Sequence, residues 1–283
     1  MSATSATGRM SAVLGEVSKL AAFGRRDVLV AWSYRLPFVA DWIGMFVQVI
    51  IFEFVGRLVR PGLVPSFGGS RATYMEFVAV GIVFSSFTGV ALARVYTVMR
   101  QEQLQGTLEA LLVTPTSSTT IELGSVVYDL LFVPVRVLVF LALTTAFVGT
   151  DYHWVGLVGL IPILLLYIPF AWGLGIMAAA WTITFKRGTG VVGLITTSVT
   201  VTSGAFFPLS VLPGWLRSLA ELNPLAIALG GAREALLGGA SAGDVAPQAL
   251  ALAPFAVVSI VGGTIAFRAA LARERRRGSL GQY

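Results

Sequence analysis

Long runs of uncharged, apolar residues dominate this sequence, and the charged residues gather in the short segments between them. A helix needs about 20 residues to cross the hydrocarbon core of a bilayer. Six runs reach or approach that length, and they cover residues 36–58, 74–98, 123–148, 155–185, 190–207 and 249–268. The sequence therefore predicts an all-α polytopic membrane protein with six transmembrane helices.

The composition leaves little room for a separate soluble domain. Of the 283 residues, 56% are hydrophobic and 12% are charged, whereas soluble domains carry about 25% charged residues. We expect a cytoplasmic amino-terminal segment at 1–35, one membrane domain at 36–268 and a basic cytoplasmic tail at 269–283. The fourth run is long, and Pro162 and Pro169 within it can kink a helix.

The distribution of Lys and Arg predicts the orientation. If the amino terminus is cytoplasmic, that side receives most of the basic residues, including the pair Arg25 and Arg26 and the group at 273–277. Basic residues near the ends of spans favour the cytoplasmic side. We therefore expect a multi-pass protein of the plasma (inner) membrane with both termini in the cytoplasm. Anchoring to an anionic leaflet explains the basic tail, and we expect no nucleic-acid partner.

The amino-terminal segment contains an amphipathic pattern. One helical face carries the small and apolar residues Val13, Leu14, Val17, Leu20, Ala21 and Gly24, while Glu16 and Lys19 lie off it. This pattern is typical of a helix that lies in the membrane interface. A solvated helix that packs on a partner is the alternative interpretation.

The segment between the second and third runs, residues 100–120, has a second amphipathic pattern. Helical spacing relates Leu104, Leu108, Leu111 and Leu112, while Glu102, Gln105 and Glu109 supply a polar face and Pro115 ends the element. The predicted orientation places this segment in the cytoplasm. A soluble partner could hold such a protruding helix; a helix that rests on the membrane surface fits the pattern equally well.

The segment between the fifth and sixth runs, residues 204–239, is too apolar for an exposed loop and too broken for a span. Pro208, Pro213, Gly214 and Pro224 interrupt it, which predicts two short helices at 214–222 and 225–237. Nonhelical backbone at membrane depth is tolerated only inside protein or beside a water-filled cavity. We therefore expect a re-entrant or interfacial helical hairpin on the outer side.

These two segments resemble the recurring motifs of ABC-2 type transporter permeases, the membrane subunits of exporters for drugs, lipids and polysaccharides. The resemblance lies in EQLQGTLEALLVTP at 102–115 and in FFPLSVLPGWLRSLAELNPL at 206–225, followed by Arg233. The candidate coupling residues are Glu102, Gly106, Thr107, Leu108, Glu109, Leu112 and Pro115. The hairpin candidates are Phe206, Phe207, Pro208, Pro213, Trp215, Asn223, Pro224 and Arg233.

The resemblance implies a homodimer of six-span subunits that engages two copies of a separate ABC ATPase. Each subunit would contact its ATPase through a coupling helix in the first cytoplasmic loop. The implied substrate is an amphipathic or lipid-linked molecule, such as a drug, a lipid or a lipid-linked polysaccharide, and the remaining partner is membrane lipid. The amino-terminal amphipathic helix resembles the interfacial connecting helix of the family.

The chain itself lacks the phosphate-binding P-loop of an ATPase. That loop requires Gly-Lys followed by Ser or Thr, but the lysines here are Lys19, after Ser18, and Lys186, after Phe185. We therefore expect no enzymatic activity and no cofactor on this chain, with ATP and Mg²⁺ bound by the partner. His153 is the one histidine and there is no cysteine, so we also predict no metal or catalytic site.

Ionisable residues inside the third run stand out because such groups usually face the interior of the protein. Asp129 and Arg136 lie seven residues apart, roughly on one face of the predicted helix. We expect Arg136 to meet a polar group at similar depth on the first helix, such as Gln48 or Glu53. The contact could be a structural ion pair, or these groups could line the path of a substrate.

Three classes of function remain open at this stage. The first is the permease subunit of an ATP-driven exporter, the second a secondary transporter or channel, and the third a nontransporting membrane assembly factor. The residues alone do not decide the substrate or the direction of transport.

Overall fold

The computed structural model describes residues 35–59, 64–104, 127–185 and 189–277, together with residues 22, 24–26, 28, 29, 33 and 62. The helices in this part of the chain are α2 (Arg35–Leu58), α3 (Tyr74–Leu104), α6 (Val127–Val148), α7 (Gly156–Phe185), α8 (Thr189–Thr202), α9 (Gly214–Glu221), α10 (Pro224–Gly238) and α11 (Ala246–Arg277). A short 3₁₀ turn, η1, covers Leu209–Val211. The strands β1 (Ser66–Phe67) and β2 (Ser70–Arg71) form a small antiparallel hairpin.

A helix lies at each of the six apolar runs, and the mostly helical architecture is confirmed. Three stretches of the described residues are both long and apolar enough to cross a membrane: Tyr74–Arg94, Gly156–Phe185 and Ala246–Arg273. Shorter apolar helices lie at Val135–Val148 and Gly190–Thr202. The β-hairpin between α2 and α3 was not expected from the sequence.

Two helices are longer than their apolar runs. Helix α3 continues to Leu104, so Glu102 lies on the last turns of α3 and not in a separate loop. Helix α11 continues through the basic group to Arg277. In both places the residues are good helix formers, and no Gly or Pro interrupts 97–104 or 264–277. The polar residues therefore extend the helix beyond the apolar part without ending it.

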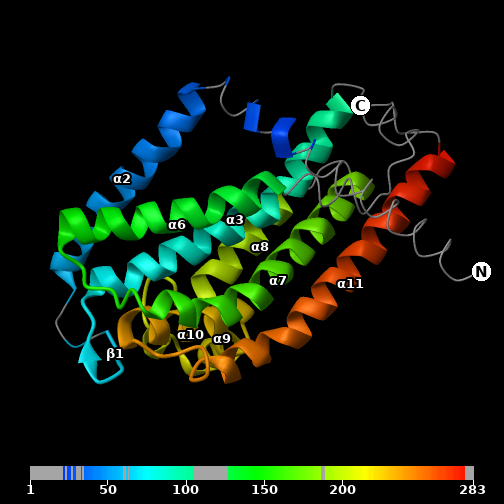
Figure 1. Ribbon diagram of the computed structural model, residues 1–283. Helices are drawn as coiled ribbons and strands as arrows, with labels where there is room; N and C mark the ends of the chain where they lie inside the picture. Colours follow the sequence, from blue (N-terminus) through cyan, green and yellow to red (C-terminus); the bar gives the residue numbers. More distant parts are fainter. Residues whose placement is uncertain are drawn as a thin grey trace, which may run out of the picture.

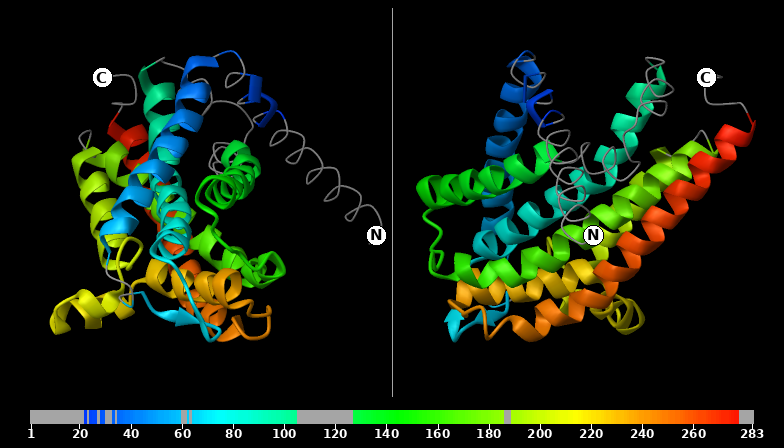
Figure 2. Two further views of the ribbon diagram at one scale, coloured as in Figure 1. Left: turned by 90° about the vertical axis from the view of Figure 1, so that its left-hand side faces the viewer. Right: turned by 45° about the vertical axis from the view of Figure 1, so that its right-hand side comes forward.

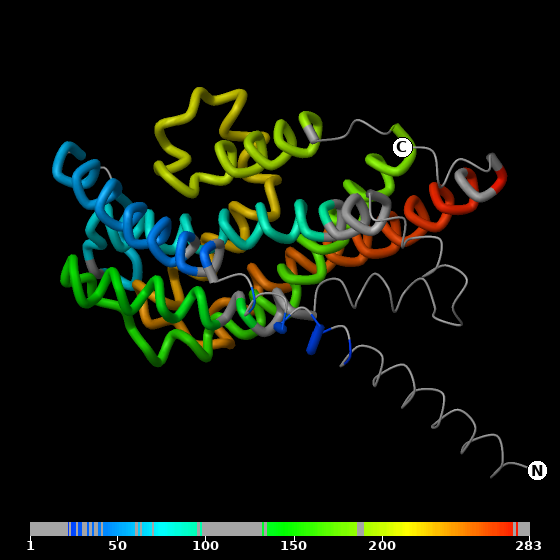
Figure 3. The backbone as a smooth tube through the Cα atoms, turned by 90° about the horizontal axis from the view of Figure 1, so that it is seen from above, coloured from blue at the N-terminus to red at the C-terminus, as the bar shows by residue number. Residues whose placement is uncertain are grey.

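The helices run between two ends of the molecule. Figures 1 and 2 show the β-hairpin, α9 and α10 gathered at one end, while the carboxyl ends of α3, α7 and α11 lie at the opposite end. Seen from above in Figure 3, α8 lies on one side of α3 and α6 on the other. Helix α3 is therefore central, and 78% of its most apolar 18-residue window is buried.

The core lies where α3, α7, α10 and α11 meet. Tyr167 of α7 is fully buried, its ring packs against Phe84 and Phe87 of α3, and its hydroxyl shares a hydrogen bond with Thr88. Helix α10 presents the buried Leu229 to this cluster. Aromatic packing and one buried polar contact thus join α3 to α7.

Helices α7 and α11 approach each other backbone to backbone. A Cβ at Gly263 of α11 would stand 2.6 Å from the carbonyl oxygen of Gly173 on α7, and a Cβ at Gly173 would overlap the backbone at Ser259 and Ile260. Close packing of small residues holds membrane helices together because the hydrophobic effect contributes little between them. The α7–α11 pair is therefore a rigid seam.

We predict that Gly173→Ala destabilises the protein by about 1–3 kcal/mol, the usual cost of overpacking a tight contact. The matched control is Gly89→Ala on α3, because a Cβ there meets no atom within 4 Å. The midpoint of thermal aggregation in mild detergent, followed by size-exclusion chromatography, measures the effect. Equal midpoints for the two variants would contradict the tight seam.

Candidate functional site

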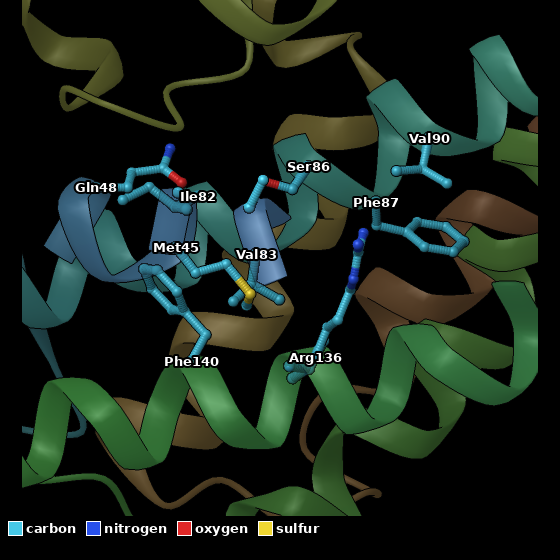
Figure 4. A pocket seen from close by; sticks show the side chains of 12 residues that line it. Met45, Gln48, Ile82, Val83, Ser86, Phe87, Val90, Arg136 and Phe140 are labelled. Atoms are coloured by element: carbon cyan, nitrogen blue, oxygen red, sulfur yellow. The ribbon is translucent and has the colours of Figure 1, made fainter. Parts of the chain in front are cut away.

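A cavity of about 700 Å³ lies between α2, α3 and α6. Its size is in the range of small-molecule sites, about 300–1,000 Å³. The lining residues are Ala40, Gly44, Met45 and Gln48 of α2; Ile82, Val83, Ser86, Phe87 and Val90 of α3; and Arg136, Val137 and Phe140 of α6. The lining is thus mostly apolar, with three polar side chains among the residues (Figure 4).

The three polar residues of the cavity, Gln48, Ser86 and Arg136, lie well away from the ends of their helices. Polar side chains at such depth in a bilayer are energetically unfavourable, and they usually mark a substrate pathway or pair with another polar group. The structure brings Gln48 and Arg136 to one cavity.

The other two intramembrane candidates are Glu53 and Asp129. Glu53 does not line the cavity, and its carboxylate accepts a hydrogen bond of 3.1 Å from Nε of Arg57, one turn further along α2. A partner four residues away on the same helix is within easy reach, and this explains the local pair. Asp129 lies on the first turn of α6, and its side chain is outside the described residues.

The predicted pair of short helices is confirmed as α9 and α10. Pro213 directly precedes α9, and Pro208 directly precedes η1. Trp215 on α9 is 70% exposed, while Phe206 and Phe207 lie in the turn after α8. The ring of Phe206 stacks on Phe52 of α2 at 5.5 Å between centroids.

Asn223 and Pro224 form the start of α10. The Asn223 side chain accepts a hydrogen bond of 2.9 Å from the Leu225 N–H, which caps the helix. Its amide nitrogen donates to the Val199 carbonyl at 2.7 Å and to Thr202 Oγ1 at 3.0 Å. Pro224 occupies the first helical position, where no N–H is needed. Asn223 therefore joins the start of α10 to the end of α8.

Arg233 of α10 connects three parts of the chain. It is 6% exposed, and its guanidinium donates to the carbonyl oxygens of Phe77 at 3.2 Å, Gly204 at 3.0 Å and Ala205 at 3.1 Å. Its Cζ lies 3.5 Å from the centroid of the Phe77 ring, a cation–π geometry. One buried cation thus holds α10, the start of α3 and the turn after α8.

Sequence reasoning missed a capping box at the start of α3. The Thr73 N–H donates to Glu76 Oε2 at 2.7 Å, and the Glu76 N–H donates to Thr73 Oγ1 at 3.2 Å. The Asp151 N–H also donates to Glu76, at 2.9 Å to Oε1. The pattern Thr-x-x-Glu at 73–76 is the signal that could have revealed it. Glu76 therefore fixes the α6–α7 connection against α3.

The same connection contains a buried phenol. Tyr152 shares a hydrogen bond of 3.0 Å with Thr144. Burial raises the pKa of the Tyr152 hydroxyl. Hydrogen bonds lower this pKa by a smaller amount, and the charge of Glu76 raises it slightly. The hydroxyl therefore stays protonated at neutral pH and serves as a structural contact.

Several predicted features lie outside the described residues. They are the coupling candidates Gly106, Thr107, Leu108, Glu109, Leu112 and Pro115, and most of the amino-terminal segment. Of Glu102, the structure describes the helical backbone. Within the described ranges, no group of three or more His, Asp or Glu side chains could hold a metal ion.

Comparison with known proteins gives a consistent match. The model of the ABC-2 type transporter family matches residues 19–237. The inner membrane transport permease YadH of Escherichia coli K12 is 28% identical over 217 residues, which cover 73% of this chain and 81% of that protein. The protein of the same name in Shigella flexneri matches with the same identity and coverage.

We predict that Arg233→Met destabilises the protein by about 3 kcal/mol, because it removes a buried cation from three carbonyl oxygens. Arg217→Met is the matched control. Arg217 on α9 pairs with Glu221, and both side chains are more than half exposed, so we expect a change within about 0.5 kcal/mol. Thermal unfolding in detergent measures both variants, and a mild effect of Arg233→Met would refute the anchoring role.

Proposed function

The chain belongs to the ABC-2 type transporter family, and on that basis we propose that it is the permease subunit of an ATP-driven exporter. It works as a homodimer and binds two copies of a separate ATPase. The family match from residue 19 to 237 carries this proposal, since it covers the coupling segment and the hairpin through Arg233, together with the last part of the amino-terminal segment. The chain itself is a transmembrane transporter subunit.

We place the protein in the inner membrane with six spans and with both termini in the cytoplasm. The positions of the helices at the two ends of the molecule support this topology. The end with α9 and α10 would face outward (Figure 1), and the opposite end, with the carboxyl ends of α3, α7 and α11, would face the cytoplasm. Arg268, Arg273 and Arg276 of α11 then meet the cytoplasmic leaflet, in keeping with the positive-inside rule.

The coupling to ATP hydrolysis would run through α3. This helix contacts Arg233 at Phe77, lines the cavity from Ile82 to Val90, and continues to Leu104, where the proposed coupling segment follows. The chain has no Gly-Lys-Ser/Thr sequence, so ATP and Mg²⁺ belong to the partner. Nucleotide-driven closure of the ATPase would push this segment and bias the dimer between two states.

The cavity supports an amphipathic substrate. Most of the described lining is apolar, and Gln48, Ser86 and Arg136 supply polar contacts. A drug, a lipid or the lipid part of a lipid-linked polysaccharide has this mixed character. The family membership and the cavity together favour export of such a molecule over a channel or an assembly function.

The partner is tested by purification from membranes in mild detergent. We expect the chain to be recovered with an equimolar ATPase whose hydrolysis is inhibited by vanadate. Glu102→Arg should lower recovery of that ATPase by about tenfold, the effect of losing about 1.4 kcal/mol of binding. Glu221→Arg, an exposed position on α9, should change nothing.

The opposing outcome is equally specific. A purified protein that has no ATPase bound and moves solute down an ion gradient would be a secondary transporter. A protein that binds no ATPase and moves no solute would be an assembly factor.

The topology is tested with single cysteines, because the natural chain contains none. We expect Ser66→Cys in β1 to react with a membrane-impermeant maleimide on intact cells, and Ala272→Cys near the end of α11 to react only after permeabilisation. Both positions are exposed. The reverse labelling pattern would invert the proposed orientation.

A further inference from the structure

We propose that α9 docks on the outer leaflet of the bilayer and places Trp215, Leu219 and Leu222 among the lipid chains. Docking itself follows from how the side chains are distributed around α9 and from where this helix lies. The proposal rests on the proposed function only in naming the leaflet as the outer one.

One face of α9 is apolar and points away from the rest of the protein. A helix turns by about 100° per residue, so Trp215, Leu219 and Leu222 lie within about 60° of one another around the axis. Each of these three side chains is more than half exposed. Large apolar side chains that gather on one exposed face mark contact with a membrane or with another protein.

The other two faces of α9 are directed to water and to the protein core. The polar face carries Arg217, Ser218 and Glu221, and Nε of Arg217 lies 3.3 Å from the Glu221 carboxylate. The remaining face carries the half-buried Leu216 and the fully buried Ala220. Segregated polar and apolar faces, with a tryptophan on the apolar one, are typical of a helix that lies in the plane of a membrane interface.

The position of α9 also suits the surface of a bilayer. The left view of Figure 2 shows α9, in yellow, projecting sideways from the other helices at the end that contains α10. The apolar helix α8 precedes this segment and exposes Leu194 and Val201 as well. Tryptophan is enriched where hydrocarbon meets water. An exposed Trp215 near the end of an apolar helix therefore favours lipid as the neighbour.

Lipid fits this face better than a second protein does. A stable interface between two proteins takes about 20–30 residues on each side, whereas the exposed apolar face of α9 consists of three side chains. A lipid surface needs no matching shape, and the pair Arg217–Glu221 on the polar face can stay among headgroups and water.

Spin labels on single cysteines test the docking, because the natural chain contains no cysteine. The full-length protein is labelled at Leu219→Cys or at Glu221→Cys, on nearly opposite sides of α9, and is placed in phosphatidylcholine nanodiscs, where both leaflets are open to reagents. Oxygen concentrates in hydrocarbon, whereas a nickel chelate stays in water. We expect the ratio of oxygen to nickel collisions to be severalfold higher at position 219 than at position 221.

A charge on the apolar face should lift α9 from the lipid. With the label at Leu222→Cys, Leu219→Asp should lower the collision ratio severalfold, because a carboxylate among lipid chains is unfavourable. Arg217→Asp is the matched control. It makes a larger change of charge on the polar face, at an exposed position, and should leave the ratio at position 222 unchanged.

Three results would overturn the proposal. Equal ratios at positions 219 and 221 would place both faces in water. Low accessibility to both reagents at position 219, with dipolar coupling between the labels of two copies, would place a second copy on this face. The third is an unchanged ratio in Leu219→Asp; if this variant does not fold, the comparison of positions 219 and 221 decides.

Failure of the proposed function is a separate result. Maleimide labelling at Ser66→Cys and Ala272→Cys decides which leaflet α9 contacts, and ATP-dependent transport in liposomes decides whether the protein is an exporter. The collision ratios in nanodiscs depend on neither, so α9 would still show lipid contact in a protein of the opposite orientation or without transport.

Discussion

The guanidinium of Arg233 donates hydrogen bonds to buried backbone carbonyls at the end of the molecule that contains α9 and α10. Gly204 and Ala205 lie in a turn between α8 and η1, outside any helix, and Arg233 donates hydrogen bonds to both of their carbonyl oxygens. Irregular backbone at membrane depth is tolerated only where protein or water supplies such partners. The same cation stacks on Phe77. The α9–α10 hairpin, the end of α8 and the start of α3 therefore depend on one buried charge.

Helix α3 connects the turn that Arg233 binds to the cavity and to the opposite end of the molecule. The carbonyl of Ala205 lies against Gly81 of α3, where any Cβ would overlap it, so the turn and the helix are in direct backbone contact. Ile82, the next residue, and Ser86, just over one turn further on, line the cavity. The helix then runs to Leu104, at the opposite end. A displacement at either end of α3 is thus expected to reach the cavity wall.

The pattern of apolar runs and helix breakers predicted most of the fold because burial and backbone geometry act locally. It located the helices and separated α9 from α10 at Asn223 and Pro224. Gln48 and Arg136, which the sequence put at similar depth, line the same cavity, while a contact between them stays a prediction. The partners of Arg233 could not be predicted, because they are backbone carbonyls that every residue carries. The pair of Glu53 with Arg57 was missed because a local partner competed with a distant one.

The position of the cavity follows from how its neighbours pack. Helices α7 and α11 meet through glycines with their backbones in contact. Moving these two helices apart would therefore break many close packing contacts. The cavity lies on the other side of α3, where α2 and α6 contribute side chains such as Met45, Arg136 and Phe140. Side chains change rotamers far more easily than packed backbones separate. We therefore expect the α2 and α6 side to widen or close around a bound molecule while α7 and α11 keep their arrangement.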